Sequence, residues 1–491
     1  KFMLQNIMPQ ITDELLILCA GAAVLEFVDG HWRFTHDKIR ETVLSDLTAA
    51  ERPGLYRDVA STTAHIYPNN PDLYRRLADL YHEAGDEERE LHFLQRALDH
   101  ALTISTYYQA SALAERTLHL LPDTPTNTAE RVRLMIHFAQ AKLGIRDWQP
   151  AYDLLIEALT LANTLNDLQL KSMCLSRLGY LENYRGHFDE GRDYLNQALD
   201  AAERSGYTEN IGPCQVFLAR IARGEGDFTS ADALYAQASF NCEAAGNQPM
   251  LSEALNGRGW IALFRGEAHS AQGHFEKSLA VSRKIGNRDL ESTALGNLGM
   301  VYLLLEDYVA SEPFVLKGLE LSRDVDDTWG VAWGHHCLGD IYWMLERYPE
   351  ALEQYEIGYG LYKSIENNTG MVFCIGGRGN VYLRLGEFDT ARVLLREALT
   401  LACSHPELMF VMWSLIGVAE WFVCQGDHIR AAGLLHRVIA HSITEQWHRA
   451  RAVRLLQTLP EELREVEPDD LATPLDILIP NLLVEMGEKA G

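Results

Sequence analysis

Apolar residues follow a helical period of about 3.6 along most of the chain, and small residues follow a longer period of 40. Steps of 40 residues from Gly179 in either direction meet only glycine or alanine. The eight positions of this small-residue column are Ala139, Gly179, Ala219, Gly259, Gly299, Gly339, Gly379 and Ala419. Because a small residue lets two helix axes approach closely, the pattern predicts one close helix crossing in every repeat.

Three further columns keep the same step and predict a helical hairpin in each repeat. The position seven residues after the small residue suits a left-handed turn, and it holds Gly186, Gly226, Gly266, Glu306, Glu346, Gly386 and Gly426. Aromatic residues follow two positions later, at Trp148, Phe188, Phe228, Tyr308, Tyr348 and Phe388. A second small residue gives the second helix its own packing face, at Ala151, Gly191, Ala231, Ala271, Ser311, Ala351, Ala391 and Ala431.

Composition and charge narrow the possible partners. The 491 residues are 47% hydrophobic, and the net charge is −26. A chain this acidic repels phosphate backbones, so we do not expect nucleic acid as a partner. The apolar run at 15–25 contains Gly21, follows Asp13 and Glu14, and is shorter than the roughly 18 residues of a membrane span. We therefore expect no signal peptide, no membrane association and a cytoplasmic location.

The sequence contains no motif for catalysis, a metal or a cofactor. None of the eight cysteines forms a CxxC pair, and Cys174, Cys214 and Cys374 lie multiples of 40 residues apart, as buried positions of a repeat would. His335 and His336 are adjacent, so they point to different helix faces. No GxxxxGK(S/T), HExxH or GxSxG motif occurs. We expect no metal site, no cofactor, no catalytic residue and hence no enzyme.

The order of the columns resembles the tetratricopeptide repeat, over about eight units between residues 130 and 445. The resemblance implies an all-α, right-handed superhelical solenoid of helical hairpins, with the first helix of each hairpin on the concave side. The step of 40 residues departs from the usual ~34. In this respect the chain resembles the extended repeats of signalling scaffolds and of the arms of regulatory ATPases.

The first 50 residues follow a different pattern. Two short apolar runs at 24–28 and 31–35 flank an Asp-Gly pair, which predicts a β-hairpin. Helical stretches at 11–22 and 36–47 surround it, and the order of helix, hairpin and helix predicts a winged-helix remnant. Residues 32–67 resemble the junction between winged helix and repeat arm in STAND-type signalling NTPases.

That resemblance rests on Phe34, His36, Ile39, Arg40, Glu41 and Arg52, and then on Ala78, Tyr81, Gly85 and Ala97. It implies an upstream nucleotide-binding module, with His36 touching the phosphates of a bound nucleotide in the resting state. A histidine that caps the adjacent helix is the alternative. Because the chain begins in mid-pattern and contains no P-loop, we expect it to be a fragment of a longer protein.

Four regions are thus predicted along the chain. They are a winged-helix remnant (1–50), a junction with the first atypical repeats (51–129), the 40-residue repeats (130–445) and C-terminal capping helices (446–491). A solenoid needs such caps because its last repeat would otherwise expose an apolar face.

The expected inner face of the first helices carries aromatic, amide and charged residues. The candidate groove residues are Arg220, Asn256, Trp260, Asn297, Trp333, His336, Asp340, Phe373, Asn380, Arg384 and Trp413. Rings offer contact area and amides bond to a backbone, so this set predicts a groove for a protein or peptide ligand. Gly257, Gly296, Gly376 and Gly377 are expected to widen it. Packing inside a tightly wound superhelix is the alternative.

The expected function is a sensor or scaffold arm that binds a protein or peptide and regulates a linked signalling NTPase. Two alternatives remain open at this point. One is a free-standing tetratricopeptide adaptor or peptide receptor, and the other is the effector-binding arm of a STAND-type transcriptional activator.

Overall fold

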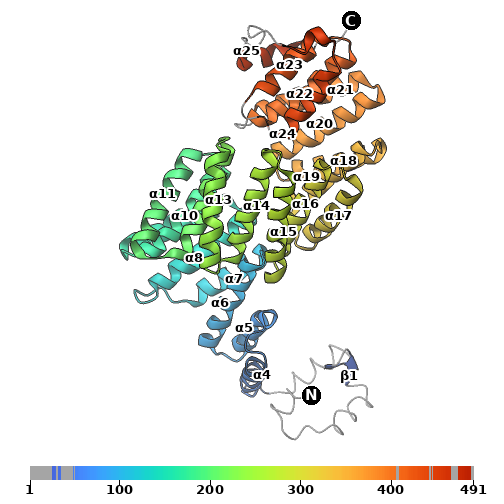
Figure 1. Ribbon diagram of the computed structural model, residues 1–491. Helices are drawn as coiled ribbons and strands as arrows, with labels where there is room; N and C mark the ends of the chain where they lie inside the picture. Colours follow the sequence, from blue (N-terminus) through green and yellow to red (C-terminus); the bar gives the residue numbers. More distant parts are fainter. Residues whose placement is uncertain are drawn as a thin grey trace. The chain divides into compact units, whose positions relative to one another are not determined.

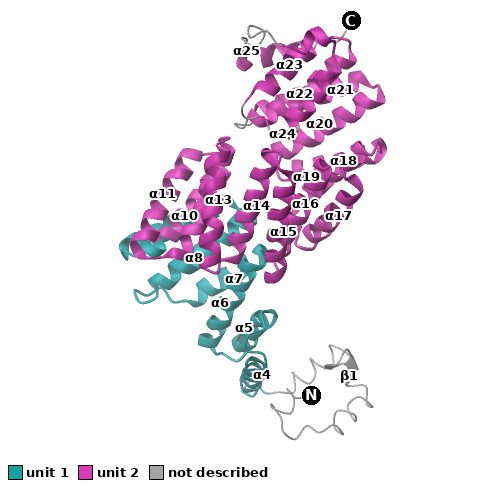
Figure 2. Cartoon of the chain, in the orientation of Figure 1, with its two compact units in different colours: residues 1–170 teal, residues 171–491 magenta. Residues whose placement is uncertain are grey.

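The computed structural model shows an almost entirely helical chain in two compact units, residues 1–170 and 171–491 (Figure 2). It describes residues 25–28, 31–34, 48, 50–404, 408–441, 444, 446–465 and 474–487. Among these residues there are 22 α-helices, arranged as consecutive hairpin pairs. No helix within the described ranges combines the length and the apolar character that a bilayer crossing requires.

The described part of unit 1 contains the predicted hairpin and six helices. Strands β1 (Leu25–Val28) and β2 (His31–Phe34) pair in antiparallel register, with Leu25 opposite Phe34, which confirms the predicted hairpin. The flanking helices of the expected winged-helix remnant, and His36 with them, lie outside the described residues. The helices of unit 1 are α4 (Arg52–Ile66), α5 (Tyr74–Glu83), α6 (Glu87–Thr103), α7 (Tyr107–Leu120), α8 (Thr128–Gly144) and α9 (Trp148–Thr164).

Unit 2 is a series of helix pairs followed by two terminal helices (Figure 1). The first helices of the pairs are α10 (Leu168–Tyr184), α12 (Ile211–Gly224), α14 (Gln248–Phe264), α16 (Arg288–Leu304), α18 (Thr328–Met344), α20 (Asn368–Leu385) and α22 (Leu408–Cys424). The second helices are α11 (Phe188–Ser205), α13 (Phe228–Ala244), α15 (Ala268–Ile285), α17 (Tyr308–Asp324), α19 (Tyr348–Ser364), α21 (Phe388–Cys403) and α23 (His428–Ala440). The terminal helices are α24 (Gln446–Gln457) and α25 (Leu475–Glu485).

A left-handed residue lies between successive helices at every twentieth position from Arg146 to Gly386. The predicted glycine column supplies six of these thirteen positions, four of them as glycine, and glycines such as Gly206 and Gly246 supply others. Glu306 and Glu346, where that column loses its glycine, adopt the same conformation with φ of 61° and 59°, although a side chain makes it less favourable. Each repeat of 40 residues is therefore two halves of equal length.

The small-residue column marks the helix crossings, as the sequence predicts. A methyl group at Gly259 would lie 2.4 Å from the Phe275 ring, and one at Gly339 would lie 2.5 Å from the Tyr355 ring. These rings belong to a further column on the second helices, sixteen residues after the small residue, which the sequence analysis missed. Its members in unit 2 include Leu195, Tyr235, Phe275, Val315, Tyr355 and Leu395. Large side chains of the second helix thus rest directly on the backbone of the first.

The repeating cysteines are buried free thiols, which confirms their predicted structural character. Cys174, Cys214 and Cys374 are fully buried. Burial raises the pKa of the Cys174 and Cys214 thiols to about 12, so these groups stay protonated and behave as small apolar side chains.

Candidate functional site

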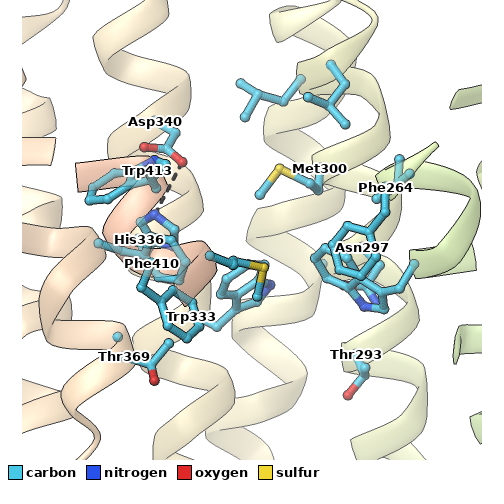
Figure 3. A pocket seen from close by; sticks show the side chains of 18 of the residues that line it. Phe264, Thr293, Asn297, Met300, Trp333, His336, Asp340, Thr369, Phe410 and Trp413 are labelled. Carbon is cyan, nitrogen blue, oxygen red and sulfur yellow. Dashed lines mark ion pairs between the residues drawn. The ribbon is translucent and has the colours of Figure 1, made fainter. Parts of the chain in front are cut away.

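A groove of about 980 Å³ runs along the first helices of unit 2 (Figure 3). Its volume lies within the usual range of about 300–1,000 Å³ for ligand sites. Ten of the eleven candidate residues line it, namely Arg220, Asn256, Trp260, Asn297, Trp333, His336, Asp340, Phe373, Asn380 and Trp413. Arg384 is not among the lining residues, and its guanidinium bonds to the Glu420 carboxylate at 2.8 Å. Whether these residues hold a ligand stays a prediction.

A continuous chain of rings connects α14 to α22 along the groove. Centroid distances are 6.2 Å from Trp260 to Trp333, 5.2 Å from Trp333 to His336, and 5.0 Å from His336 to Phe373. Trp413 then meets the edge of Phe373 at 5.2 Å. The chain includes the predicted column of Trp333, Phe373 and Trp413, and the imidazole of His336 bridges the first two members.

Aromatic rings pack against the groove glycines and fill the space that a side chain would occupy. These glycines therefore do not widen the groove, which corrects the sequence prediction. A methyl group at Gly376 would lie 2.4 Å from the Trp413 ring, and one at Gly377 would lie 2.5 Å from the Tyr355 ring. A methyl group at Gly257 would similarly lie 2.4 Å from Tyr235. The glycines therefore let aromatic side chains lie flat against the helix backbone, and these rings become part of the groove.

In the N-terminal half of the groove, helices α12–α16, polar side chains bond to one another. The side-chain amide of Asn297 donates to Oδ1 of Asn256 at 2.6 Å, which links α16 to α14. The Arg220 guanidinium forms an ion pair with Glu253 and lies 5.8 Å from the ring centre of Tyr180. This half of the groove thus satisfies these polar groups internally.

In the C-terminal half, helices α18–α22, several polar atoms lack such partners. The imidazole Nε2 of His336 lies 3.3 Å from Oδ2 of Asp340 (Figure 3). The Tyr355 hydroxyl donates to the same carboxylate at 2.6 Å. Nδ1 of His336 and Oδ1 of Asn380 are buried without a hydrogen-bond partner among the described residues. Burial lowers the pKa of His336, against the opposing effect of Asp340, so the imidazole is neutral at neutral pH.

Helix α24 contributes a basic wall to the groove that the sequence analysis missed. One side of the helix is buried against the last repeats through Ala452 and Leu456. The other side lines the groove with His448, Arg451 and Arg454, which recur every third residue in a helix without acidic residues. That spacing was the available signal, but the helix lies outside the repeat and was treated as a cap alone.

Arg451 fixes the position of α24 against α18 and α22. Its guanidinium bonds to the Glu420 carboxylate at 2.9 Å and lies 5.2 Å from the ring centre of Trp343. Glu420 is buried and also binds Arg384, so one carboxylate holds two guanidinium groups.

Comparison with known proteins agrees with this architecture. Residues 251–324 and 290–364 match the family model for the tetratricopeptide repeat. Together with the helix pairs, this match places the chain in the class of all-α, tetratricopeptide-type solenoids. No curated protein matches the chain.

Solved structures with similar folds are distant in sequence. A Rap protein complexed with Competence and Sporulation Factor is 17% identical, with a TM-score of 0.55, and the alignment covers 72% of this chain and 97% of that chain. A STAND protein with a tetratricopeptide repeat sensor from Pyrococcus horikoshii is 16% identical, with a TM-score of 0.39, 94% of this chain and 62% of that chain being covered. The similarity to the Rap protein concerns the fold alone.

Proposed function

We propose that unit 2 is a sensor or scaffold module that binds a protein or peptide segment in its groove. The observation that carries this proposal is the chain of rings from Trp260 to Trp413, to which helices α14, α18, α20 and α22 contribute. Aromatic anchors dominate the energetics of protein recognition, and a row of them suits an extended segment. A solved Rap protein with this fold is complexed with Competence and Sporulation Factor, which is consistent with a partner-binding role.

A selection of binders from a randomised peptide library tests the proposal on the full chain. Selected peptides are titrated against the wild type and against Trp333→Ala and Phe373→Ala. Each substitution removes a ring from the groove and is expected to weaken binding by about 2 kcal/mol or more. The matched control is Phe240→Ala, because Phe240 is 73% exposed and does not line the groove.

Both variants should remain folded at the temperature of the titration, which their melting temperatures establish, while their affinities for the peptide fall. Normal binding by folded Trp333→Ala and Phe373→Ala would show that the rings are packing, and that partners use another surface. In that case the alternative of a tightly packed superhelix would hold.

We further propose that groove occupancy regulates a linked NTPase. Support comes from the resemblance of Phe34, His36 and Arg40 to the STAND junction. The reading frame upstream of Lys1 tests this proposal, since a P-loop there is required. If the frame lacks a P-loop, the free-standing adaptor is favoured, whereas a DNA-binding domain elsewhere in the gene favours the transcriptional activator.

His36 has a specific role in the NTPase proposal. In the longer protein, His36→Ala is expected to lower the affinity for ADP and to raise basal activity, because a donor to phosphate is lost. Calorimetry with ADP measures the first effect, and an unchanged affinity would remove the phosphate role of this histidine.

A further inference from the structure

Asp340 differs from the other carboxylates that line the groove because its charge has no cationic partner. Glu253 pairs with Arg220, and Glu306 faces Arg454 at 4.0 Å. Asp340 accepts only from a tyrosine hydroxyl and from an imidazole. No lysine or arginine of the described residues forms an ion pair with it. Because the imidazole of His336 is neutral, it contributes a hydrogen bond and no full positive charge to Asp340.

The position of Asp340 leaves this charge partly buried and still accessible from the groove. Its side chain is 28% exposed and lines the groove, so it is partly removed from water while a ligand can still reach it. A desolvated charge is unfavourable unless an opposite charge and hydrogen bonds accompany it. A positively charged group that enters the groove would supply both.

Two buried acceptors that line the same groove as Asp340 also lack donors. His336 and Asn380 are 4% and 5% exposed and line the same groove. Asn380 follows Asp340 by one repeat, on helix α20, which packs against α18. Its buried Oδ1 is an acceptor without a donor, and so is Nδ1 of neutral His336. Buried polar atoms in native proteins are almost always satisfied, so these acceptors call for a group that donates hydrogen bonds.

Aromatic side chains border this cluster of acceptors. The His336 ring stacks on Phe373 with an interplanar angle of 13° and meets Trp333 at 5.2 Å, while Tyr355 bonds to Asp340 directly. Aromatic faces attract cations more strongly when water is excluded. Negative charge, an unpartnered imidazole nitrogen and aromatic faces therefore lie together at Asp340 and His336, and Asn380 lies one repeat further along the same groove.

We propose that Asp340 and Asn380 form a subsite for a cationic group of the ligand, either an ammonium or a guanidinium group. Asp340 supplies the opposite charge, Oδ1 of Asn380 accepts a further hydrogen bond, and neighbouring rings exclude water. This inference rests on the proposed function of the groove and defines the chemistry of its partner: a segment with a lysine, an arginine or a free N-terminus placed at the C-terminal half.

The randomised peptide library tests the subsite in two arms, one with free and one with acetylated N-termini. Both arms are selected against the full wild-type chain and, in parallel, against Asp340→Asn. We expect lysine or arginine to be enriched at one position in the wild-type pool and not in the variant pool. If the free N-terminal ammonium is the ligand group, only the first arm yields binders that depend on Asp340.

Titration of one selected peptide then measures the contribution of the charge. Asp340→Asn keeps an acceptor for Tyr355 but removes the charge, and it should weaken a lysine-bearing peptide by about 10- to 100-fold. The same peptide with norleucine in place of lysine should bind the wild type and Asp340→Asn equally. Asn380→Asp adds a second carboxylate and should strengthen the lysine peptide.

The control Asp326→Asn makes the same change of charge outside the groove. Asp326 is exposed and has a φ of 56°, a conformation that asparagine adopts readily, so binding should be unchanged. If Asp340→Asn melts early, the norleucine peptide and Asn380→Asp decide the question in folded proteins.

The outcomes separate the subsite from the groove itself. Peptides that depend on Trp333 but show no cation preference, or that bind Asp340→Asn as tightly as the wild type, would overturn the subsite and leave the proposed function intact. A library that yields no groove-dependent binder would overturn both.

Discussion

The two halves of the groove are built from the same 40-residue repeat, yet their polar side chains differ in how their hydrogen bonds are satisfied. In the N-terminal half, Asn297 bonds to Asn256 and Arg220 pairs with Glu253. In the C-terminal half, His336 and Asn380 keep buried atoms without partners. The small-residue column supports both halves in the same way. The difference therefore arises from the inner-face residues alone, which can vary without altering the helix crossings beneath them.

The largest expected effect concerns this shared support. Gly259→Leu changes the N-terminal half, and Gly339→Leu changes the C-terminal half. The Cβ atom alone would lie 2.4 Å from a ring at position 259 and 2.5 Å from a ring at position 339. Since overpacking a helix crossing is costly, each variant should lose about 3 kcal/mol or more of unfolding free energy. Chemical denaturation measures the loss, and it should be similar in the two halves.

Glycines elsewhere in the same repeats provide the matched controls. A Cβ at Gly273 on α15 or at Gly360 on α19 would meet no atom within 4 Å. Gly273→Leu and Gly360→Leu should therefore be neutral, or stabilising by up to about 1 kcal/mol, because leucine favours helix more than glycine. Equal losses at all four positions would show that the small-residue column has no special packing role.

A second prediction concerns how firmly α24 closes the C-terminal half. Arg451→Ala removes a guanidinium from the buried Glu420 carboxylate and from the Trp343 ring, and should cost about 1–3 kcal/mol. Arg454→Ala is the control on the same helix. Its pair with Glu306 is 4.0 Å long between side chains that are two-thirds exposed, so its loss should cost about 0.5 kcal/mol or less. Equal effects would mean that Arg451 does not position the helix.

The third prediction uses the acidic side of the pH range. Burial lowers the pKa of His336 in the folded chain below its ordinary value of 6.5. As pH falls below about 6.5, the unfolded chain binds a proton that the folded chain does not bind, so stability decreases by up to about 1.4 kcal/mol per pH unit. His336→Gln should reduce this slope.

Comparison of the two slopes isolates His336 from other histidines. Burial also lowers the pKa of His335 and His274, and both remain in the variant. Denaturation curves between about pH 5 and pH 7 provide the measurement. Parallel slopes for wild type and His336→Gln would show that His336 titrates in the folded chain as it does in the unfolded chain.

The repeat could be predicted from sequence because each column serves one physical need that recurs. Turn glycines and small residues at crossings are required in nearly every unit, and the structure confirms the helix pairs that they imply. Even where Glu306 replaces glycine, the turn keeps its left-handed conformation. Ten groove-lining residues of the first helices were also predicted, because their position depends on which side of each first helix faces inward.

The relations among those residues were not accessible in the same way. Asn256 and Asn297 were both assigned to a ligand, whereas the structure bonds them to each other. His335 and His336 do point to different helix faces, as predicted, but spacing did not indicate that His335 bonds to Gln354 while His336 stacks on Phe373. Such pairings depend on the rotation of one helix against the next, which spacing along the chain does not specify. Helix α24 was missed as a groove wall because it occurs once and has no column.

The smallest expected effect is the most direct test of the difference between the halves. Asn297→Ala removes a bonded amide and leaves Asn256 without its donor, so the free protein should lose about 1 kcal/mol. Asn380→Ala removes an amide whose buried oxygen has no partner, so its loss should cost almost nothing and can stabilise the free protein slightly. Both variants should nevertheless weaken a groove-bound peptide. Urea denaturation without a ligand measures the unfolding free energy of both variants. If Asn380→Ala loses as much stability as Asn297→Ala, the Asn380 amide is hydrogen-bonded within the folded chain and is not available to a ligand.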